Sequence, residues 1–345
     1  MPPTNPNKLR AASSAALASF TKPHLPGLST SSFQSSSLNT AAPHTTIHPQ
    51  TIVTPQQTCC SQLRSQILTP SSNNSTPFIR PFSTSTPNMS AMKATGGHSA
   101  ACCNIPPVVS SGYQKKGDYE TIGGTKTYVT GPVKEASKGI LVIMDIFGFF
   151  DQTVQGCDIL ATADEHNKYA VFMPDAFDGE PLPIELFPPD NEEKQEKVGA
   201  FFGKNSPPSY VPKVHSAVKA AQEKYPNIKE WGVVGFCWGS KVISLCVSKP
   251  DNPFKIAAQC HPAMVDPKDA ESIKIPLVLL ASKDEPVEDV KKFEAALTGP
   301  KHVETYADQI HGWMAARSDL KDKRVQEEYT RGYKTVLTFF GNNWP

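Results

Sequence analysis

Short apolar runs that alternate with helix-length segments are the feature of this sequence that most constrains its fold. Residues 140–146 read ILVIMDI, a near-continuous apolar run that is typical of a strand buried on both faces of a parallel sheet. Further strands are expected at residues 170–173, 231–236, 256–259, 276–281 and 303–306, and a short hairpin at 121–128. Helices are expected at residues 151–167, 211–225, 241–247, 287–297 and 324–340. This alternation predicts one three-layer α/β domain, in which helices cover both faces of a mostly parallel sheet.

One long segment interrupts the alternation. Residues 176–210 hold many prolines and charged side chains, which do not suit a buried strand. We expect this segment to form an excursion above the sheet.

The distribution of charge divides the chain into two parts. No Asp or Glu precedes Asp118, and the first 117 residues carry 8 Lys and Arg, 34 Ser and Thr, and 14 Pro. The remaining 228 residues hold 26 basic and 33 acidic side chains, a formal charge of −7. A segment so poor in large apolar residues cannot bury enough surface to offset the entropy lost on ordering. We therefore expect a disordered leader over residues 1–111 and one globular domain over residues 112–345.

The composition of the leader suits a mitochondrial transit peptide. The leader has no acidic residue and is rich in serine, and Leu9, Ala16 and Phe20 lie at helical spacing close to Arg10. Met89 and Met92 are alternative internal starts, and either would leave the protein without this address. A mitochondrial and a cytoplasmic location therefore both stay open.

Several classes of protein are disfavoured. No run of about 18 apolar residues exists, so no membrane-spanning helix is expected. The acidic charge of the domain argues against nucleic acid as the main partner. The 8 cysteines include the adjacent pairs 59–60 and 102–103, and no CxxC spacing, so neither a disulfide framework nor a thiol redox site is expected. Within residues 112–345 no HxxxH spacing occurs that would support a metal site, and we expect neither metal nor cofactor.

The strongest signal for catalysis is the run Gly235-Phe236-Cys237-Trp238-Gly239, at the junction of a predicted strand and a predicted helix. Nucleophile elbows have the form G-x-nucleophile-x-G on a strained turn between a strand and a helix, where a side chain in place of either glycine would collide with its surroundings. The start of the following helix favours a thiolate at Cys237. The alternative is a buried structural cysteine between two packing glycines.

Partners for Cys237 follow in the order nucleophile, acid, histidine that this architecture uses. Asp284 and His311 each follow a late predicted strand, so both are expected at the carboxyl edge of the sheet. Glu285 is a rival for the acid, and His261 is a rival for the base. The order and the strand context favour a triad of Cys237, Asp284 and His311.

Four ordered motifs resemble the dienelactone hydrolase family, whose members have the α/β-hydrolase fold. The resemblance covers about residues 112–345 and rests on the segments 145–148 (DIFG), 235–239 (GFCWG), 282–284 (SKD) and 311–313 (HGW), with Arg317 shortly after. It implies that Cys237 is the nucleophile, that His311 is the general base and then acid, and that Asp284 orients the histidine. It also implies an oxyanion hole made by the backbone N–H groups of Trp238 and Ile146.

The resemblance further implies four substrate-binding residues, which are Asp145, Phe147, Trp313 and Arg317. The bacterial type of the family has Glu, one methylene longer, at the position of Asp145. That type also binds a substrate carboxylate with two arginines, whereas no arginine precedes Arg317 within the domain. The candidates for the missing cation are Lys194, Lys197 and Lys204. An apolar pocket is expected to be lined by Trp238, Trp313, Phe147 and Phe149.

These features together predict a carboxylic ester hydrolase of the carboxymethylenebutenolidase type. It would cleave an enol lactone or a small activated ester through a thioester acyl-enzyme. A thioesterase, a general carboxylesterase or a biosynthetic tailoring hydrolase on the same triad is an open alternative. A non-catalytic binding module that keeps the elbow for structure is an alternative of another class. The expected partner is a small ester or lactone, and the expected state is a monomer.

Overall fold

Eight strands form one sheet in the computed structural model, which describes residues 108–345. The strands are β1 (Asp118–Ile122), β2 (Thr125–Thr130), β3 (Lys138–Ile143), β4 (Tyr169–Pro174), β5 (Glu230–Phe236), β6 (Ile256–Cys260), β7 (Leu277–Ser282) and β8 (Lys301–Tyr306). Their order is β1-β2-β4-β3-β5-β6-β7-β8. The β1–β2 hairpin and the β2–β4 pair are antiparallel, and the other pairs are parallel. The prediction of a mostly parallel sheet is confirmed.

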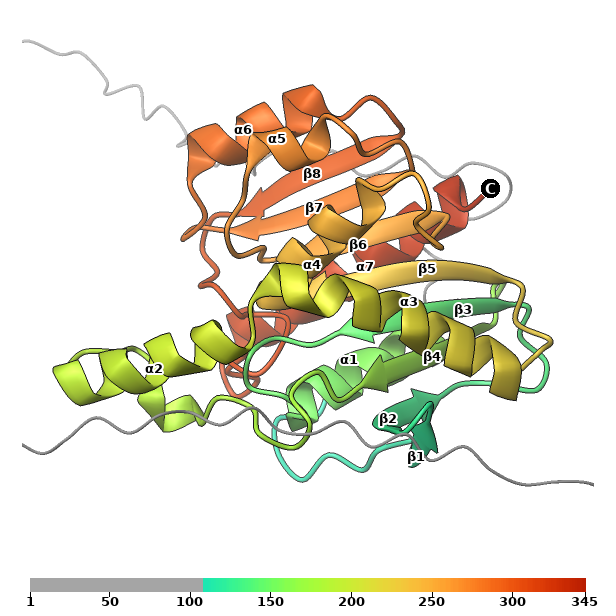
Figure 1. Ribbon diagram of the computed structural model, residues 1–345, viewed down its shortest axis with the longest axis horizontal. Helices are drawn as coiled ribbons and strands as arrows, with labels where there is room; N and C mark the ends of the chain where they lie inside the picture. The colour runs from blue at the N-terminus through green and yellow to red at the C-terminus, as the bar shows by residue number, and fades with distance from the viewer. Residues whose placement is uncertain (1–107) are drawn as a thin grey trace, which may run out of the picture. The chain divides into compact units, whose positions relative to one another are not determined.

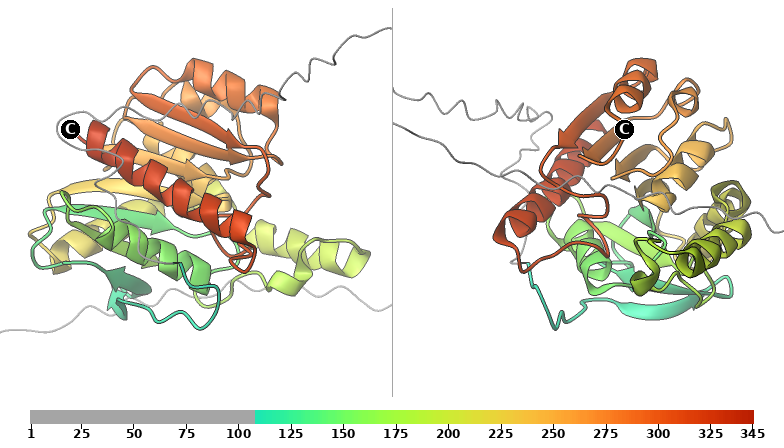
Figure 2. Two further views of the ribbon diagram at one scale, coloured as in Figure 1. Left: turned by 180° about the vertical axis from the view of Figure 1, so that it is seen from behind. Right: turned by 90° about the vertical axis from the view of Figure 1, so that its left-hand side faces the viewer.

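Helices cover both faces of this sheet (Figures 1 and 2). The helices are α1 (Asp151–Thr162), α2 (Glu192–Lys204), α3 (Pro207–Lys224), α4 (Trp238–Val247), α5 (Pro267–Ala270), α6 (Val287–Ala296) and α7 (Lys323–Asn343), with a 3-10 turn, η2, at Ile184–Leu186. Helices α1 and α7 lie on one face, and α3, α4, α5 and α6 lie on the other (Figure 2). The three layers are those of an α/β-hydrolase fold. Within residues 108–345, no helix combines the length and the apolar character needed to cross a membrane.

The two helical layers explain why the central strands have near-continuous apolar sequences. Every residue of β4, β6 and β7 is buried. Side chains alternate between the two faces of a strand, so each face needs apolar residues to pack against its own helices. Burying one large aliphatic or aromatic side chain stabilises the fold by about 1.5–3 kcal/mol, which makes these strands the main source of stability.

The structure differs from the predicted elements in the excursion at 176–210. This segment contains α2, which projects from the domain on the side where the arrowheads of β7 and β8 lie (Figure 1). The Asn191 side chain caps α2 by accepting a hydrogen bond from the Lys194 amide, and two glutamates occupy its first turn. These are ordinary helix-start signals. None of the residues of α2 is buried, although Val198 and Phe201 pack half-buried against the core. The prolines and charged residues around this helix, not the absence of an apolar face, led the prediction to miss it.

The domain begins earlier than residue 112. The Val109 amide donates to Oε1 of Gln155 (2.7 Å), and Nε2 of Gln155 donates back to the Val109 carbonyl (3.1 Å). Nε2 of Gln326 donates to the Val108 carbonyl (2.9 Å). Residues 108–111, which the prediction assigned to the leader, are therefore tied to α1 and α7. The rest of the expected leader lies outside the described residues, and its targeting role stays a prediction.

One buried carboxylate fastens the start of the domain to the sheet. Asp158 of α1 accepts hydrogen bonds from the hydroxyls of Tyr113 (2.7 Å), Tyr128 (2.8 Å) and Thr130 (2.6 Å), and from the amide of Lys116 (2.9 Å). Four donors satisfy the two carboxylate oxygens, as a buried charge requires. The Asp158 cluster thus joins the entry segment, β2 and α1.

Candidate active site

Cys237 lies on a sharp turn between β5 and α4. Its backbone has φ 52° and ψ −114°, a left-handed conformation that is strained for a residue with a side chain. Its amide donates to the Cys260 carbonyl (3.1 Å), which fixes the turn against β6. A Cβ added at Gly239 would lie 2.3 Å from the Ile143 carbonyl oxygen, so only glycine fits there. This is the geometry of a nucleophile elbow.

His311 reaches Cys237 from the loop that follows β8. Its imidazole is half-buried, and the Cys237 side chain is one of the groups that raise its pKa, so the two side chains lie close together. Nδ1 lies 2.6 Å from Oε1 of Glu285. Burial of the ring opposes its charging, but the hydrogen bonds and charges of Cys237 and Glu285 outweigh this effect and raise the pKa of His311 to about 10. The site therefore holds a positively charged imidazole beside the Cys237 side chain.

The carboxylate at the imidazole belongs to Glu285, and the prediction that Asp284 contacts the ring is wrong. Asp284 is exposed, and its Oδ2 accepts a hydrogen bond from the His311 backbone amide (2.8 Å). Glu285 is 5% exposed, and its carboxylate also accepts hydrogen bonds from the amide and the hydroxyl of Ser282. The turn after β7 directs Glu285 inward and Asp284 outward. The sequence offered no signal for the supporting role of Ser282.

The two amides expected to form the oxyanion hole are both available. Among the described residues, no acceptor is found for the N–H of Trp238 or of Ile146. Trp238 is the first residue of α4, where the helix dipole adds positive character to the amide. The loop of Ile146 is held by a hydrogen bond from the Leu182 amide to the Ile146 carbonyl (2.8 Å). The assignment of these amides as an oxyanion hole stays a prediction.

Asp145 braces two loops of the site from inside the protein. Oδ1 accepts a hydrogen bond from the Phe147 amide (3.0 Å), and Oδ2 accepts one from the Ala316 amide (3.1 Å). Burial raises the pKa of Asp145 to about 6, although these amides and the charges of His311 and Arg317 pull it down. Asp145 is 1% exposed, so its predicted contact with a substrate is wrong. It instead joins the Ile146 loop to the segment that follows His311.

The aromatic residues expected to line a pocket are mostly part of the core. Trp313 is fully buried and stacks on Tyr306, with 4.3 Å between ring centroids. Trp238 is 1% exposed, and its indole N–H donates to the Asn205 carbonyl (2.9 Å). The predicted contacts of both tryptophan rings with a substrate are therefore wrong, while the Trp238 backbone N–H stays a candidate for the oxyanion hole. Phe147 is buried, and its ring packs against that of Phe187 at 6.0 Å.

Phe149 is half-buried, but it lies against the β1–β2 hairpin. Its ring packs edge-on against Tyr119 (5.1 Å between centroids), and the Lys126 ammonium lies 5.3 Å from its centroid. These contacts account for its position without a role in substrate binding.

Arg317 places a cation beside the candidate triad. Its Nη1 donates to the His311 carbonyl (2.7 Å), and its guanidinium lies 5.0 Å from the ring centroid of Phe187. The side chain is half-buried, so it can still meet a substrate group. The three lysines of the excursion each pair with an acidic side chain: Lys194 with Asp190, Lys197 with Glu193, and Lys204 with Glu180.

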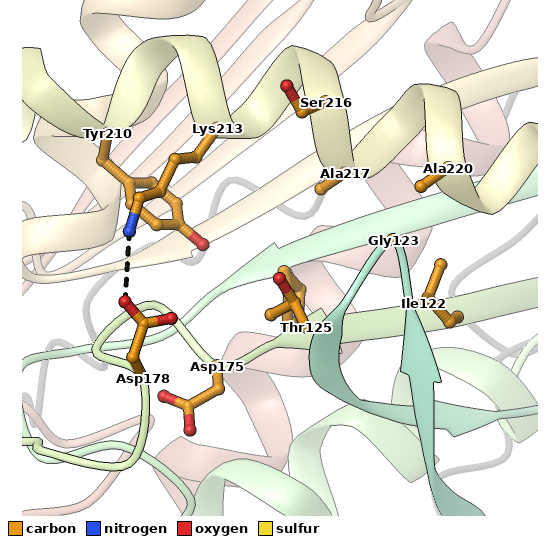
Figure 3. Close-up of a pocket in the computed structure, with 11 residues that line it drawn as sticks. Ile122, Gly123, Thr125, Asp175, Asp178, Tyr210, Lys213, Ser216, Ala217 and Ala220 are labelled. Carbon is orange, nitrogen blue, oxygen red and sulfur yellow. Dashed lines mark hydrogen bonds and ion pairs between the residues drawn. The ribbon is translucent and has the colours of Figure 1, made fainter.

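A pocket of about 210 Å³ lies between the β1–β2 hairpin and α3 (Figure 3). Tyr210 and the ion pair of Lys213 with Asp178 (3.4 Å) are on one side of it, and neither Cys237 nor His311 lines it. We therefore do not place the chemistry there. Within the described part of the chain, no three His, Cys, Asp or Glu side chains are arranged to hold a metal ion.

Comparison with known proteins agrees with this architecture. Residues 125–343 match the model of the dienelactone hydrolase family. The chain is 36% identical over 252 residues to an uncharacterized AIM2 family protein of Schizosaccharomyces pombe, a match that covers 70% of this chain and 98% of the relative. It is 23% identical over 196 residues to the human carboxymethylenebutenolidase homolog, covering 55% of this chain and 76% of the relative.

Among solved structures, a putative dienelactone hydrolase from Klebsiella pneumoniae is similar, with a TM-score of 0.49 and 19% identity over 63% of this chain and 92% of that chain. The family model covers well over half of the present sequence. The match to the Schizosaccharomyces pombe relative covers nearly the whole length of that relative. The chain belongs to the dienelactone hydrolase family.

Proposed function

We propose that this hydrolase cleaves an enol lactone or another small activated ester through Cys237, His311 and Glu285. The observation that carries the proposal is the continuous chain of contacts from the strained Cys237 to His311 and on to the buried Glu285. Side chains in this order, with a buried carboxylate behind the histidine, activate a nucleophile for acyl transfer. The family supports a hydrolase, and the triad and the substrate class are the proposed parts.

The first half of the reaction forms a thioester. The Cys237 thiolate attacks the ester carbonyl carbon, and the charge that develops on the carbonyl oxygen is met by the N–H groups of Ile146 and Trp238. Loss of one such donor in comparable sites costs about 2.7–4 kcal/mol of transition-state stabilisation. The carbon–oxygen bond then breaks, and the His311 imidazolium protonates the departing enolate or alkoxide.

The second half releases the acid and restores the enzyme. His311, now neutral, takes a proton from a water molecule that attacks the thioester carbonyl. The carbon–sulfur bond breaks, so that the products are a carboxylic acid, an alcohol or enol, and the original thiolate–imidazolium pair. Glu285 holds Nδ1 of His311 throughout and stabilises the ring when it is charged.

Arg317 is the group that we propose receives an anionic substituent of the substrate. Only one of its N–H groups is committed to the His311 carbonyl, and the guanidinium is a planar fork suited to a carboxylate. The lysines that could add a second cation are engaged with acidic side chains. We therefore propose that neutral activated esters are also accepted.

The test compares the full 345-residue chain with its Cys237→Ala variant, and with Cys246→Ala as the matched control. Cys246 is buried in α4 and takes no part in the proposed chemistry. Hydrolysis of a dienelactone, of p-nitrophenyl acetate and of an acyl thioester is followed for each protein. We expect turnover of the lactone or the aryl ester to fall by at least about 10³-fold in Cys237→Ala only.

Other results would change the proposal in different ways. Turnover of the thioester alone would favour a thioesterase on the same triad. Turnover that survives in Cys237→Ala would count against Cys237 as the nucleophile. No turnover by the unaltered chain would count against the proposed chemistry and favour the binding-module alternative.

A further inference from the structure

A second histidine lies directly behind His311, and the proposed reaction does not use it. His261 follows the last residue of β6, and its amide donates to the Leu280 carbonyl (2.7 Å). Two residues later, the Ala263 amide donates to the Cys237 carbonyl (3.1 Å). The loop that carries His261 is thus tied to both β7 and the elbow.

The backbone conformation of His261 and the burial of its polar ring both cost the fold stability. Its φ of 38° lies in the left-handed region, which is uncommon for residues other than glycine. Its side chain is fully buried, and neither ring nitrogen has a hydrogen-bond partner among the described residues. Each unsatisfied buried polar group destabilises a fold by about 1–3 kcal/mol, whereas an apolar ring of the same shape avoids that cost. Strain and unpaired polarity at one residue beside a reaction centre point to a functional reason.

The ring contacts of His261 show what it supports. Its ring stacks on Phe236, the residue before the nucleophile, at 5.7 Å between centroids and an interplanar angle of 30°. It meets the His311 ring at 5.2 Å and 69°, a T-shaped contact. The other polar contacts of the His311 side chain are with Cys237 and Glu285. His261 therefore packs directly against the His311 ring from within the protein.

The two rings differ in charge. Burial, together with the positive charges of His311 and Arg317, lowers the pKa of His261 well below its usual value, so that this ring is neutral. A neutral imidazole keeps one nitrogen with a free lone pair, and in a site of low dielectric such a group stabilises a neighbouring cation. Phenylalanine would fill the same space without that lone pair.

We propose that His261 is a positioning residue that holds the His311 ring against Cys237 and Glu285 and stabilises its charged form. The expected effect of His261 on the rate of ester hydrolysis rests on the proposed function. Its effect on the thiolate of Cys237 does not, because the thiolate and the imidazolium stabilise each other before any substrate binds.

The test uses His261→Phe and His261→Gln in the full chain, with His215→Phe as the matched control. His215 lies in α3, where its Nε2 is 3.8 Å from Cys246 Sγ. The readouts are the rate of Cys237 alkylation by iodoacetamide at pH 7, the melting temperature, and kcat and KM for p-nitrophenyl acetate. We expect His261→Phe to melt at the same or a higher temperature, yet to alkylate more slowly by up to about tenfold, the most that a loss of one pKa unit of imidazolium stabilisation can produce. Its kcat should fall by a similar factor, with KM nearly unchanged.

The order of the two variants separates this role from simple packing. The polar side chain of His261→Gln should retain more of the alkylation rate than His261→Phe, even though it fills the space less well. A packing role requires the opposite order, with His261→Phe close to the unaltered chain, and that result would overturn the proposal. An alkylation rate in His261→Phe equal to that of His215→Phe would overturn it as well. If the unaltered chain hydrolyses no ester, the proposed function fails, while the alkylation rates still decide the role of His261.

Discussion

Oε1 of Glu285 lies 2.6 Å from Nδ1 of His311, whereas the neighbouring Asp284 accepts a hydrogen bond from the backbone amide of the same histidine. Two adjacent carboxylates thus contact one residue in two different ways. Glu285 acts on the ring that carries the proton. Asp284 instead fixes the position of the His311 backbone by accepting a hydrogen bond from its amide.

This difference predicts a large gap between two matched substitutions. Glu285→Gln leaves the shape of the side chain intact but removes the charge that holds Nδ1 protonated, and we expect kcat/KM to fall by about 10²–10⁴-fold. Asp284→Asn keeps an acceptor for the His311 amide, and we expect a change of less than about fivefold. Steady-state hydrolysis of p-nitrophenyl acetate by both variants measures the gap. The reverse order would restore Asp284 as the acid.

The sequence alone predicts the order of the site but not the identity of its acid. The elbow, the following acidic pair and the late histidine are recognisable because chain order and strand context are properties of the fold. The choice between Asp284 and Glu285 depends on the turn after β7, where Ser282 holds the Glu285 carboxylate. The conformation of this turn depends on three-dimensional contacts, and the adjacent residues Asp284 and Glu285 do not by themselves reveal which side chain points inward.

The same limit applies to residues with two plausible environments. Trp313 beside His311 is compatible with a pocket wall or with the core, and only the packing against Tyr306 identifies the core. The Asp158 cluster has no sequence pattern, because its hydroxyl donors lie 28 to 45 residues away in the chain. By contrast, β4, β6 and β7 were predictable, since burial on both faces requires a continuous apolar run.

A second prediction concerns the thiolate. Because the contacts of His311 raise its pKa to about 10, the ring stays charged across the neutral range, and a positive charge beside a cysteine favours its reactive form. We expect alkylation of Cys237 by iodoacetamide to be faster than that of the other seven cysteines at pH 7 and to vary little between pH 6 and 8.5. In His311→Gln, the rate should instead rise with pH as for an ordinary thiol, whose pKa is about 8.5. Mass spectrometry of the modified peptides gives both rates, and equal rates at all cysteines would contradict the prediction.

A third prediction follows from the buried Asp145. Its folded pKa of about 6 lies above the unfolded value of about 3.9, so its protonated form favours the folded state. The stability that this group contributes is complete below pH 3.9 and is lost as pH rises through 6. Relative to Asp145→Asn, the unaltered chain should therefore lose about 1–2 kcal/mol of unfolding free energy between pH 5 and 7.5. Urea denaturation of both proteins at the two pH values measures it, and a difference that is independent of pH would show that Asp145 does not titrate in this range.

A fourth prediction tests the Asp158 cluster. Asp158→Ala leaves the buried hydroxyls of Tyr128 and Thr130 without their acceptor, together with the donors of the entry segment. We expect the free energy of unfolding to fall by about 3 kcal/mol or more. Asp151→Ala at the exposed start of α1 is the matched control, and its helix-dipole contribution limits the loss to about 1 kcal/mol. Similar losses in the two variants would mean that the cluster adds little.

The last prediction concerns the elbow glycines, for which α2 offers a control within the same chain. A Cβ at Gly239 would lie 2.3 Å from the Ile143 carbonyl oxygen and 2.8 Å from that of Met144, and backbone atoms cannot turn away as a flexible side chain can. Gly239→Ala must therefore push α4 and Cys237 away from β3, and we expect a loss of about 3 kcal/mol in stability and slower alkylation of Cys237. Gly199→Ala meets nothing within 4 Å on exposed α2, and the higher helix propensity of alanine should add about 0.5–1 kcal/mol. Denaturation and alkylation of both variants are measured together. If Gly239→Ala kept full stability and a normal alkylation rate, the close contact between α4 and β3 would not be what fixes the nucleophile.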